Sequence, residues 1–246
     1  MKILAIYFRS GSGISVIYER IFCELAKHAT VDVLSDMAHS TESMPIRNTY
    51  SLPMSRFTQS LYRKCLRNFG KAPISEWWSR KAMRVVANDY DLVIAFVASS
   101  QLTPIVSGKL IAEKLGCKFA IYSVDAIPAP GGWTKPREYR GKLKIVSKYF
   151  ASADYVASSN KHMLDFQLST FKHKQGLRSN VLLTPSPNEE YHFPVSNEEL
   201  ILYTGSLYGL RNPNYMFGAF KRLLKTYPNA RLQLVGMKHR LRQMDE

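Results

Sequence analysis

Short apolar runs rich in β-forming residues alternate along the chain with longer segments whose apolar residues recur at helical spacing. Residues 2–8 form the first such run, and residues 14–28 follow with isoleucines and Leu25 on one helical stripe. Residues 91–97 are a continuous β-rich run of the kind that parallel sheets bury on both faces. This alternation predicts a mostly parallel sheet with helices packed on its faces.

The alternation continues as far as residue 184. The other expected strands are 31–34, 118–124, 155–157 and 180–184, and the other expected helices are 57–69, 75–87, 103–115, 142–150 and 161–171. Thr103 and Pro104 are typical of an N-cap and a first-turn proline, and Gly116 is typical of a C-terminal stop. Residues 1–187 are therefore predicted to form one α/β domain with a Rossmann-like, doubly wound, mostly parallel sheet.

Prolines then interrupt the pattern. Pro185, Pro187 and Pro194 stand among polar residues as they would in a linker, which we place at residues 188–199. A new unit follows, with strands at 200–203 and 231–235 and a helix that starts at Asn212 and Pro213 and runs to about 226. Because one βαβ unit cannot close a core by itself, residues 200–246 are predicted to be the beginning of a second, truncated Rossmann-like domain.

Composition narrows the classes of partner. Thirty-four Lys and Arg against 19 Asp and Glu give a net charge of +15, which favours nucleotide phosphates, lipid headgroups or nucleic acid as partners. No apolar run approaches the roughly 20 residues of a membrane-spanning helix, and the first residues resemble a strand more than a signal peptide. Cys23, Cys65 and Cys117 have the spacing of neither a disulfide framework nor a zinc site. We expect a cytoplasmic protein without a bound metal.

Ligands of open parallel sheets bind beyond the carboxyl ends of the strands. The residues found there are small and polar, with one carboxylate: Arg9, Ser10, Gly11, Gly13, Ser99, Asp125, Ser158 and Asn160. Each also has a structural explanation, since glycines permit a tight turn, Asp125 could cap a turn before Pro128, and Ser158 to Asn160 could cap the next helix. The pattern predicts a polar cleft, but the missing third glycine and ribose carboxylate disfavour a dinucleotide site.

A basic and aromatic segment lies between residues 56 and 84, which contain eight Lys and Arg and a single acid, Glu76. Two explanations stay open: solvated helices whose aromatics pack on the sheet, or helices that lie in the interface at the inner face of a membrane. Residues 135–148 form a second basic stretch. No helix-turn-helix, RRM or zinc signature supports nucleic-acid binding. The candidate membrane patch comprises Arg63, Lys64, Arg67, Trp77, Trp78, Arg80 and Lys81.

The second unit carries the most specific motifs. Residues 200–207 (LILYTGSL), Arg211 to Pro213, and 228–236 (PNARLQLVG) resemble the opening of the C-terminal domain of GT-B glycosyltransferases of the family 4-like group, also called group 1. His192 to Pro194 resembles the linker that precedes this domain. The resemblance covers residues 185–236 and is only architectural before them.

The resemblance implies transfer of a sugar from a nucleotide-diphosphate-sugar to a glycan or lipid-linked acceptor, as in a hexosyltransferase of polysaccharide biosynthesis. The first domain would bind the acceptor, and Gly205, Ser206 and Arg211 would cradle the donor diphosphate without any further cofactor. Ser206 stands where the group often has arginine, and the acidic donor motif is expected beyond Glu246, so these residues alone are expected to be an incomplete and inactive portion.

Stereochemistry and role stay open at this point. An inverting enzyme would use a carboxylate base such as Asp125, whereas a retaining enzyme needs none. The alternatives are a non-catalytic subunit that recruits a donor-binding chain of a split glycosyltransferase to the membrane, and a nucleotide-binding oxidoreductase or epimerase.

Overall fold

The computed structural model describes residues 1–8, 12–37, 45–98, 101–129, 134–184, 199–205 and 213–236, with only the backbone for residues 12–16. The chain separates into two compact units, Met1–Ser186 and Pro187–Glu246.

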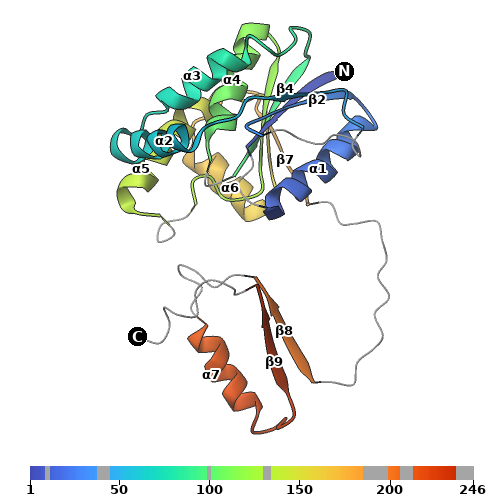
Figure 1. The fold of residues 1–246 in the computed structure, drawn as a ribbon, viewed down its shortest axis with the longest axis vertical. Coiled ribbons are helices and arrows are strands. Elements are labelled where there is room, and N and C mark those ends of the chain that lie inside the picture. Colours follow the sequence, from blue (N-terminus) through green and yellow to red (C-terminus); the bar gives the residue numbers. More distant parts are fainter. Residues whose placement is uncertain are drawn as a thin grey trace. The chain divides into compact units, whose positions relative to one another are not determined.

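The first unit is built on a sheet of seven strands in the order β3-β2-β1-β4-β5-β6-β7, and every neighbouring pair is parallel (Figure 1). The prediction of a Rossmann-like, mostly parallel sheet is therefore confirmed. From β1 the chain adds β2 and β3 on one side of the sheet, and it then adds β4 to β7 on the other side of β1. The strands are β1 (Lys2–Tyr7), β2 (Thr30–Ser35), β3 (Asn48–Ser51), β4 (Leu92–Val97), β5 (Lys118–Ser123), β6 (Tyr155–Ser158) and β7 (Arg178–Val181).

Helices cover the two faces of this sheet unequally. Alternate residues of β1 point to opposite sides: Ile3 and Tyr7 pack with Phe22 of the first helix, whereas Leu4 and Ile6 pack with the other helices. Right-handed crossovers account for the division, because the chain leaves β1 in one direction and later advances from β4 in the other. The helices are α1 (Ser12–Ala26), α2 (Arg56–Phe69), α3 (Pro73–Ala82), α4 (Thr103–Leu115), α5 (Pro136–Phe150) and α6 (Lys161–Thr170).

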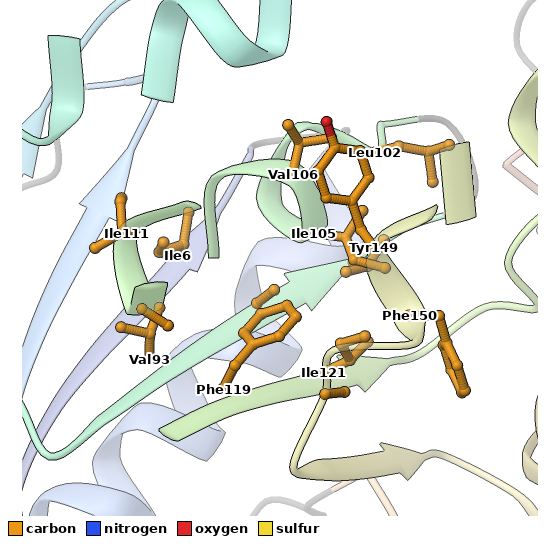
Figure 2. Close-up of a cluster of buried hydrophobic side chains, with 14 of the residues drawn as sticks. Ile6, Val93, Leu102, Ile105, Val106, Ile111, Phe119, Ile121, Tyr149 and Phe150 are labelled. Carbon is orange, nitrogen blue, oxygen red and sulfur yellow. The ribbon is translucent and has the colours of Figure 1, made fainter. Parts of the chain in front are cut away.

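The larger core lies on the face covered by α4 and α5. Figure 2 shows Phe119 and Ile121 of β5 among Ile105 of α4 and Phe150 of α5, all of them buried. Gly108 permits this packing, because a Cβ there would come within 2.5 Å of the Phe119 ring. Full burial of each such apolar side chain stabilises the unit by roughly 1.5–3 kcal/mol.

Three local predictions need correction or extension. Thr103 is not the N-cap of α4: Leu102 holds that position, and the Gln101 side chain accepts hydrogen bonds from the amide and hydroxyl of Thr103. Helix α5 begins at Pro136, six residues before the predicted start at 142, and α3 ends at Ala82 rather than 87. Gly116 is confirmed as the C-terminal stop of α4, with a left-handed φ of 66°.

The second unit contains the expected βαβ arrangement. Strands β8 (Leu200–Thr204) and β9 (Arg231–Val235) pair in parallel, and α7 (Asn214–Leu223) connects them. Pro213 is the N-cap of α7, whereas Asn212 lies outside the described residues. Within the described part of this unit, α7 buries no side chain and three successive apolar residues of β8 are exposed.

Candidate functional site

The loops after β5 and β6 meet at the carboxyl edge of the first unit's sheet. The Ser159 amide donates to the Ser123 carbonyl at 3.1 Å, and the Ser159 hydroxyl donates to the Val124 carbonyl at 3.0 Å. These bonds hold the two loops together just before Asp125. Ile127 is fully buried, so the far side of the Asp125 loop is also anchored.

Tyr18 of α1 is a polar group at this edge that the sequence did not single out. Its ring is almost fully buried in edge-to-face contact with Tyr7, Phe96 and Tyr122. Burial, and then the nearby negative charge of Asp125, raise the pKa of the Tyr18 hydroxyl. Among the described residues, no hydrogen-bond partner is found for this hydroxyl. The edge therefore combines a neutral phenol with a partly exposed carboxylate.

A partly exposed carboxylate such as Asp125 can orient and deprotonate the hydroxyl group of a bound ligand, whereas the buried Tyr18 hydroxyl is enclosed by the unit. No sequence signal separated Tyr18 from its neighbours, because it lies in the same helix as the apolar residues Ile17 and Ile21. Tyr122, whose hydroxyl donates to the Leu182 carbonyl at 3.3 Å, was hidden in the same way inside a β-forming run.

The unpartnered hydroxyl leads to a prediction about stability. We expect Tyr18→Phe to leave the free energy of unfolding unchanged or to raise it by up to about 1 kcal/mol, because a buried hydroxyl without a partner is itself destabilising. Tyr90→Phe is the matched control, since the Tyr90 hydroxyl donates to Asp32 at 2.5 Å, and it should lower stability by about 1.5–3 kcal/mol. Urea denaturation measures both. A loss above about 1 kcal/mol for Tyr18→Phe would show that its hydroxyl has a partner.

Ser158 and Asn160 have structural roles. Ser158 is fully buried, and its hydroxyl bonds to the hydroxyl of Ser123 at 3.0 Å and to the side-chain oxygen of Gln167 at 3.3 Å. The Asn160 side chain caps α6 by accepting from the Met163 amide at 2.9 Å. The capping explanation that the sequence left open is the one the structure supplies for Asn160.

Other candidates cannot be placed. Arg9, Ser10, Gly11, Ser99, Ser206 and Arg211 lie outside the described residues, and Gly13 is described only as backbone in the first turn of α1.

Gly205 directly follows strand β8 in the second unit. Its φ is 135°, a conformation that favours glycine, and its amide donates to the Val235 carbonyl at 2.8 Å. A Cβ at Gly236 would come within 3.0 Å of the Gly205 carbonyl oxygen, so the ends of β8 and β9 approach closely as bare backbone. The N-terminus of α7, which has no side-chain cap, belongs to the same βαβ unit. Backbone amides at such a strand end and helix start suit a phosphate.

The candidate membrane patch is exposed except at one position. Arg63, Lys64, Arg67, Arg80 and Lys81 are exposed, as is Trp77, whose ring lies 4.1 Å below the Lys81 ammonium. Trp78 does not belong to this surface, because it is only 1% exposed and its indole donates to the Leu52 carbonyl at 2.9 Å. Adjacent positions of a helix point in different directions, so one tryptophan faces solvent and the next faces Phe8.

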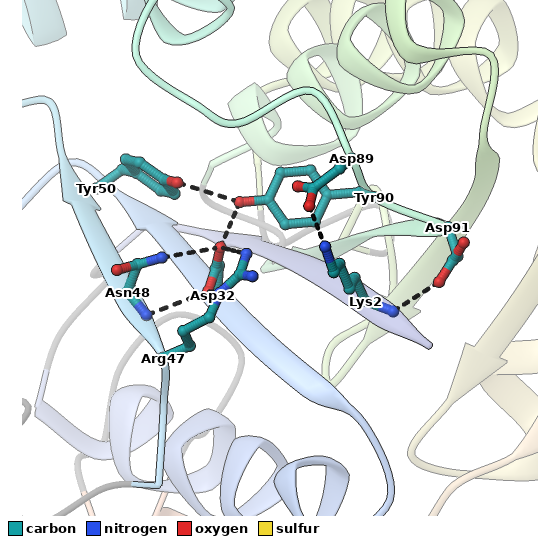
Figure 3. Close-up of polar contacts among 8 residues, drawn as sticks. All are labelled: Lys2, Asp32, Arg47, Asn48, Tyr50, Asp89, Tyr90 and Asp91. Carbon is teal, nitrogen blue, oxygen red and sulfur yellow. Dashed lines mark hydrogen bonds and ion pairs between the residues drawn. The ribbon is translucent and has the colours of Figure 1, made fainter.

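A polar network at the opposite, amino end of the sheet serves the fold rather than a ligand (Figure 3). The fully buried carboxylate of Asp32 accepts from Arg47 Nε at 2.9 Å and Nη2 at 2.6 Å, and from the Tyr90 hydroxyl at 2.5 Å. Burial alone raises the pKa of Asp32, but the hydrogen bonds from Arg47 and Tyr90 outweigh it, and the pKa is lowered. The network therefore stabilises ionised Asp32.

Two negative findings concern the described part of the chain. It contains no cluster of three or more His, Cys, Asp or Glu side chains suited to hold a metal ion. None of its helices is both long enough and apolar enough to cross a membrane.

Solved structures of glycosyltransferases share this Rossmann-like fold. UGT2 of Phytolacca americana, complexed with UDP-2fluoro-glucose and pterostilbene, superposes with a TM-score of 0.56 at 12% identity over 96% of this chain and 66% of that one. Arabidopsis thaliana UGT89C1 gives 0.52 at 13% identity over 98% of this chain and 67% of that one. The glycosyltransferase of kitacinnamycin gives 0.50 at 12% identity over 100% and 68%.

These similarities show the fold, and the chain spans about two thirds of the length of the structures it matches. No protein-family model matches the sequence. No curated protein matches it either.

Proposed function

We propose that this chain belongs to a glycosyltransferase of the family 4-like group that transfers a hexosyl unit from a nucleotide-diphosphate-sugar to a hydroxyl group of a glycan or a lipid-linked acceptor. The observation that carries the proposal is the succession of two units: a seven-stranded parallel sheet with a polar carboxyl edge, and a βαβ unit whose first strand is followed by Gly205. Support comes from UGT2 of Phytolacca americana, which was solved with a UDP-sugar analogue and matches 96% of this chain.

The acceptor would bind at the carboxyl edge of the first unit. Asp125, which is partly exposed, would accept the proton of the attacking hydroxyl if the reaction inverts the anomeric centre. A retaining reaction would leave Asp125 to orient the acceptor only. Either role uses the same partly exposed carboxylate, so the proposal does not depend on stereochemistry.

The donor diphosphate would bind at the end of β8. Gly205 leaves room for a phosphate against bare backbone, and the start of α7 would add amide donors. Ser206 and Arg211 would complete the phosphate cradle, with Arg211 offsetting the negative charge that develops on the leaving nucleoside diphosphate. Such a site needs no cofactor other than the donor substrate.

Calorimetric titration tests the donor class. We expect UDP-sugars or GDP-sugars to bind weakly, with a Kd of about 1 mM, since the chain spans about two thirds of its structural neighbours. Gly205→Ala should weaken this binding at least several-fold, because an alanine side chain is strained at a φ of 135° and enters the phosphate space.

Gly218→Ala is the matched control, since a Cβ at Gly218 would meet nothing within 4 Å and the affinity should not change. An amide NMR spectrum of each variant shows whether weaker binding comes from loss of the site or from loss of the fold. Tighter binding of NAD than of any nucleotide-sugar would contradict the proposal and favour an oxidoreductase or epimerase.

A further inference from the structure

Helices α2, α3 and α5 pack next to one another and carry many exposed basic side chains. Their acids are only Glu76 and Glu138, and both are engaged inside the unit: Glu76 accepts from the Tyr149 hydroxyl at 2.7 Å, and Glu138 pairs with Lys142 at 3.0 Å. The basic face comprises Arg63, Lys64, Arg67, Lys71, Arg80, Lys81, Lys144 and Lys148.

Most of this charge is not compensated within the unit. In the part of the chain that the structure describes, no carboxylate forms an ion pair with Lys64, Lys71 or Lys144. Lys71 and Lys144 line one cavity, where like charges repel one another and raise the local concentration of anions. The basic face therefore favours an extended anionic partner over a single counter-ion.

Large apolar side chains stand exposed on the same helices. Phe57 is 78% exposed and Leu61 38% exposed, one helical turn apart on α2 and turned away from the buried Leu66. Phe69 at the end of α2 is 67% exposed, and Trp77 on α3 is 45% exposed. No packing within the described unit accounts for these side chains, and exposed apolar groups among cations mark interaction sites.

A bilayer suits this combination better than a nucleic acid. Sequence-independent nucleic-acid sites track the strand through a groove lined by stacking rings, whereas Phe57 and Leu61 lie on the outer side of a helix and Leu61 cannot stack. Basic residues with Trp, Phe and Leu on a helix surface are typical of segments that lie in the lipid interface. Between the α2–α3 turn and α5, a cavity of about 240 Å³ is lined by Lys71, Lys144 and Lys148, with room for a phosphate group. Glu76 also lines it and pairs with Lys148 at 3.3 Å, so Lys71 and Lys144 are the lysines left to bind a phosphate.

We propose that the face formed by α2, α3 and α5 docks on an anionic phospholipid bilayer, with Phe57, Phe69 and Trp77 entering the interface and the lysines around the cavity contacting headgroup phosphates. The docking does not depend on the proposed catalytic function, because it needs neither a donor nor an acceptor.

Vesicle co-sedimentation with the full chain tests the docking. The protein should bind vesicles of phosphatidylcholine mixed with phosphatidylglycerol at low salt, bind vesicles of phosphatidylcholine alone far less, and lose most of its binding at high salt. The triple variant Lys64→Ala, Lys71→Ala, Lys144→Ala should lower the partition coefficient about 100-fold, because it removes three cations that are each attracted to the anionic surface.

The control variant removes the same charge elsewhere. Lys27→Ala, Lys118→Ala, Arg178→Ala loses three exposed cations outside α2, α3 and α5 and should bind nearly as well as the parent chain. If the two triple variants lost vesicle binding equally, net charge alone would explain the binding, and the proposal would be overturned. Binding to single-stranded RNA without binding to vesicles would also overturn it.

Tryptophan fluorescence locates the contact. Emission should shift to shorter wavelength when anionic vesicles are added, and Trp77→Phe should remove that shift while circular dichroism remains unchanged. A shift that persists in Trp77→Phe would place the lipid contact elsewhere and contradict the assignment to this face.

Discussion

Replacing Asp32 with asparagine is expected to lower the free energy of unfolding of the first unit by about 3 kcal/mol, because it removes the charge that a fully buried side chain shares with Arg47 and Tyr90. Chemical denaturation monitored by circular dichroism measures the change. Asp165→Asn is the matched control: its exposed pair with Lys161 should contribute no more than about 1 kcal/mol. Equal effects at the two positions would contradict the role given to Asp32.

The same carboxylate predicts how stability depends on pH. Since the pKa of Asp32 is lower in the folded state, its stabilisation is fully present above the unfolded pKa of about 3.9. It is lost as the pH falls below that value through the lower folded-state pKa. The parent chain should therefore lose stability more steeply with acid than Asp32→Asn does, and parallel stability curves would show that Asp32 does not titrate as described.

Replacing Gly141 with alanine should separate α2 from α5. A Cβ at Gly141 would lie 2.3 Å from the Leu66 carbonyl oxygen, which is backbone and cannot rotate away. We expect overpacking to lower the free energy of unfolding by about 3 kcal/mol and the better helix propensity of alanine to raise it by about 1 kcal/mol. The net loss of stability is about 2 kcal/mol. Thermal and chemical denaturation measure the result.

Gly218→Ala is again the control, because its Cβ would meet nothing within 4 Å and should add stability to α7 through helix propensity alone. A neutral or stabilising Gly141→Ala would mean that α2 and α5 are not held in contact at this glycine.

Periodicity predicted most elements of the fold, and the exceptions have physical reasons. Strand β3 was missed because Asn48–Ser51 has no apolar run and pairs only with β2 at the sheet edge. The first turn of α5 was missed because Pro136, Arg137 and Glu138 carry no apolar stripe, although proline is favoured there. The spacing of apolar residues indicates which side chains become buried. Polar edge strands and exposed first turns bury few side chains, so this spacing does not predict them.

The candidate site was less predictable than the fold. Asp125 could be selected because a lone carboxylate follows a clear strand, but Tyr18 looked like any member of an apolar helix stripe. Trp77 and Trp78 could not be distinguished until the phase of α3 was known. Pairing between distant segments, such as Asp32 with Tyr90, has no local pattern and needs the three-dimensional structure.

The most direct test of the central claim is an amide-resolved NMR titration of the full chain with UDP-glucose and, in parallel, with NAD. UDP-glucose is expected to shift the amide resonances of Gly205 and of the first turn of α7, and these shifts should disappear in Gly205→Ala. Shifts confined to the first turn of α1 and produced by NAD would contradict this expectation and indicate a dinucleotide-binding protein instead.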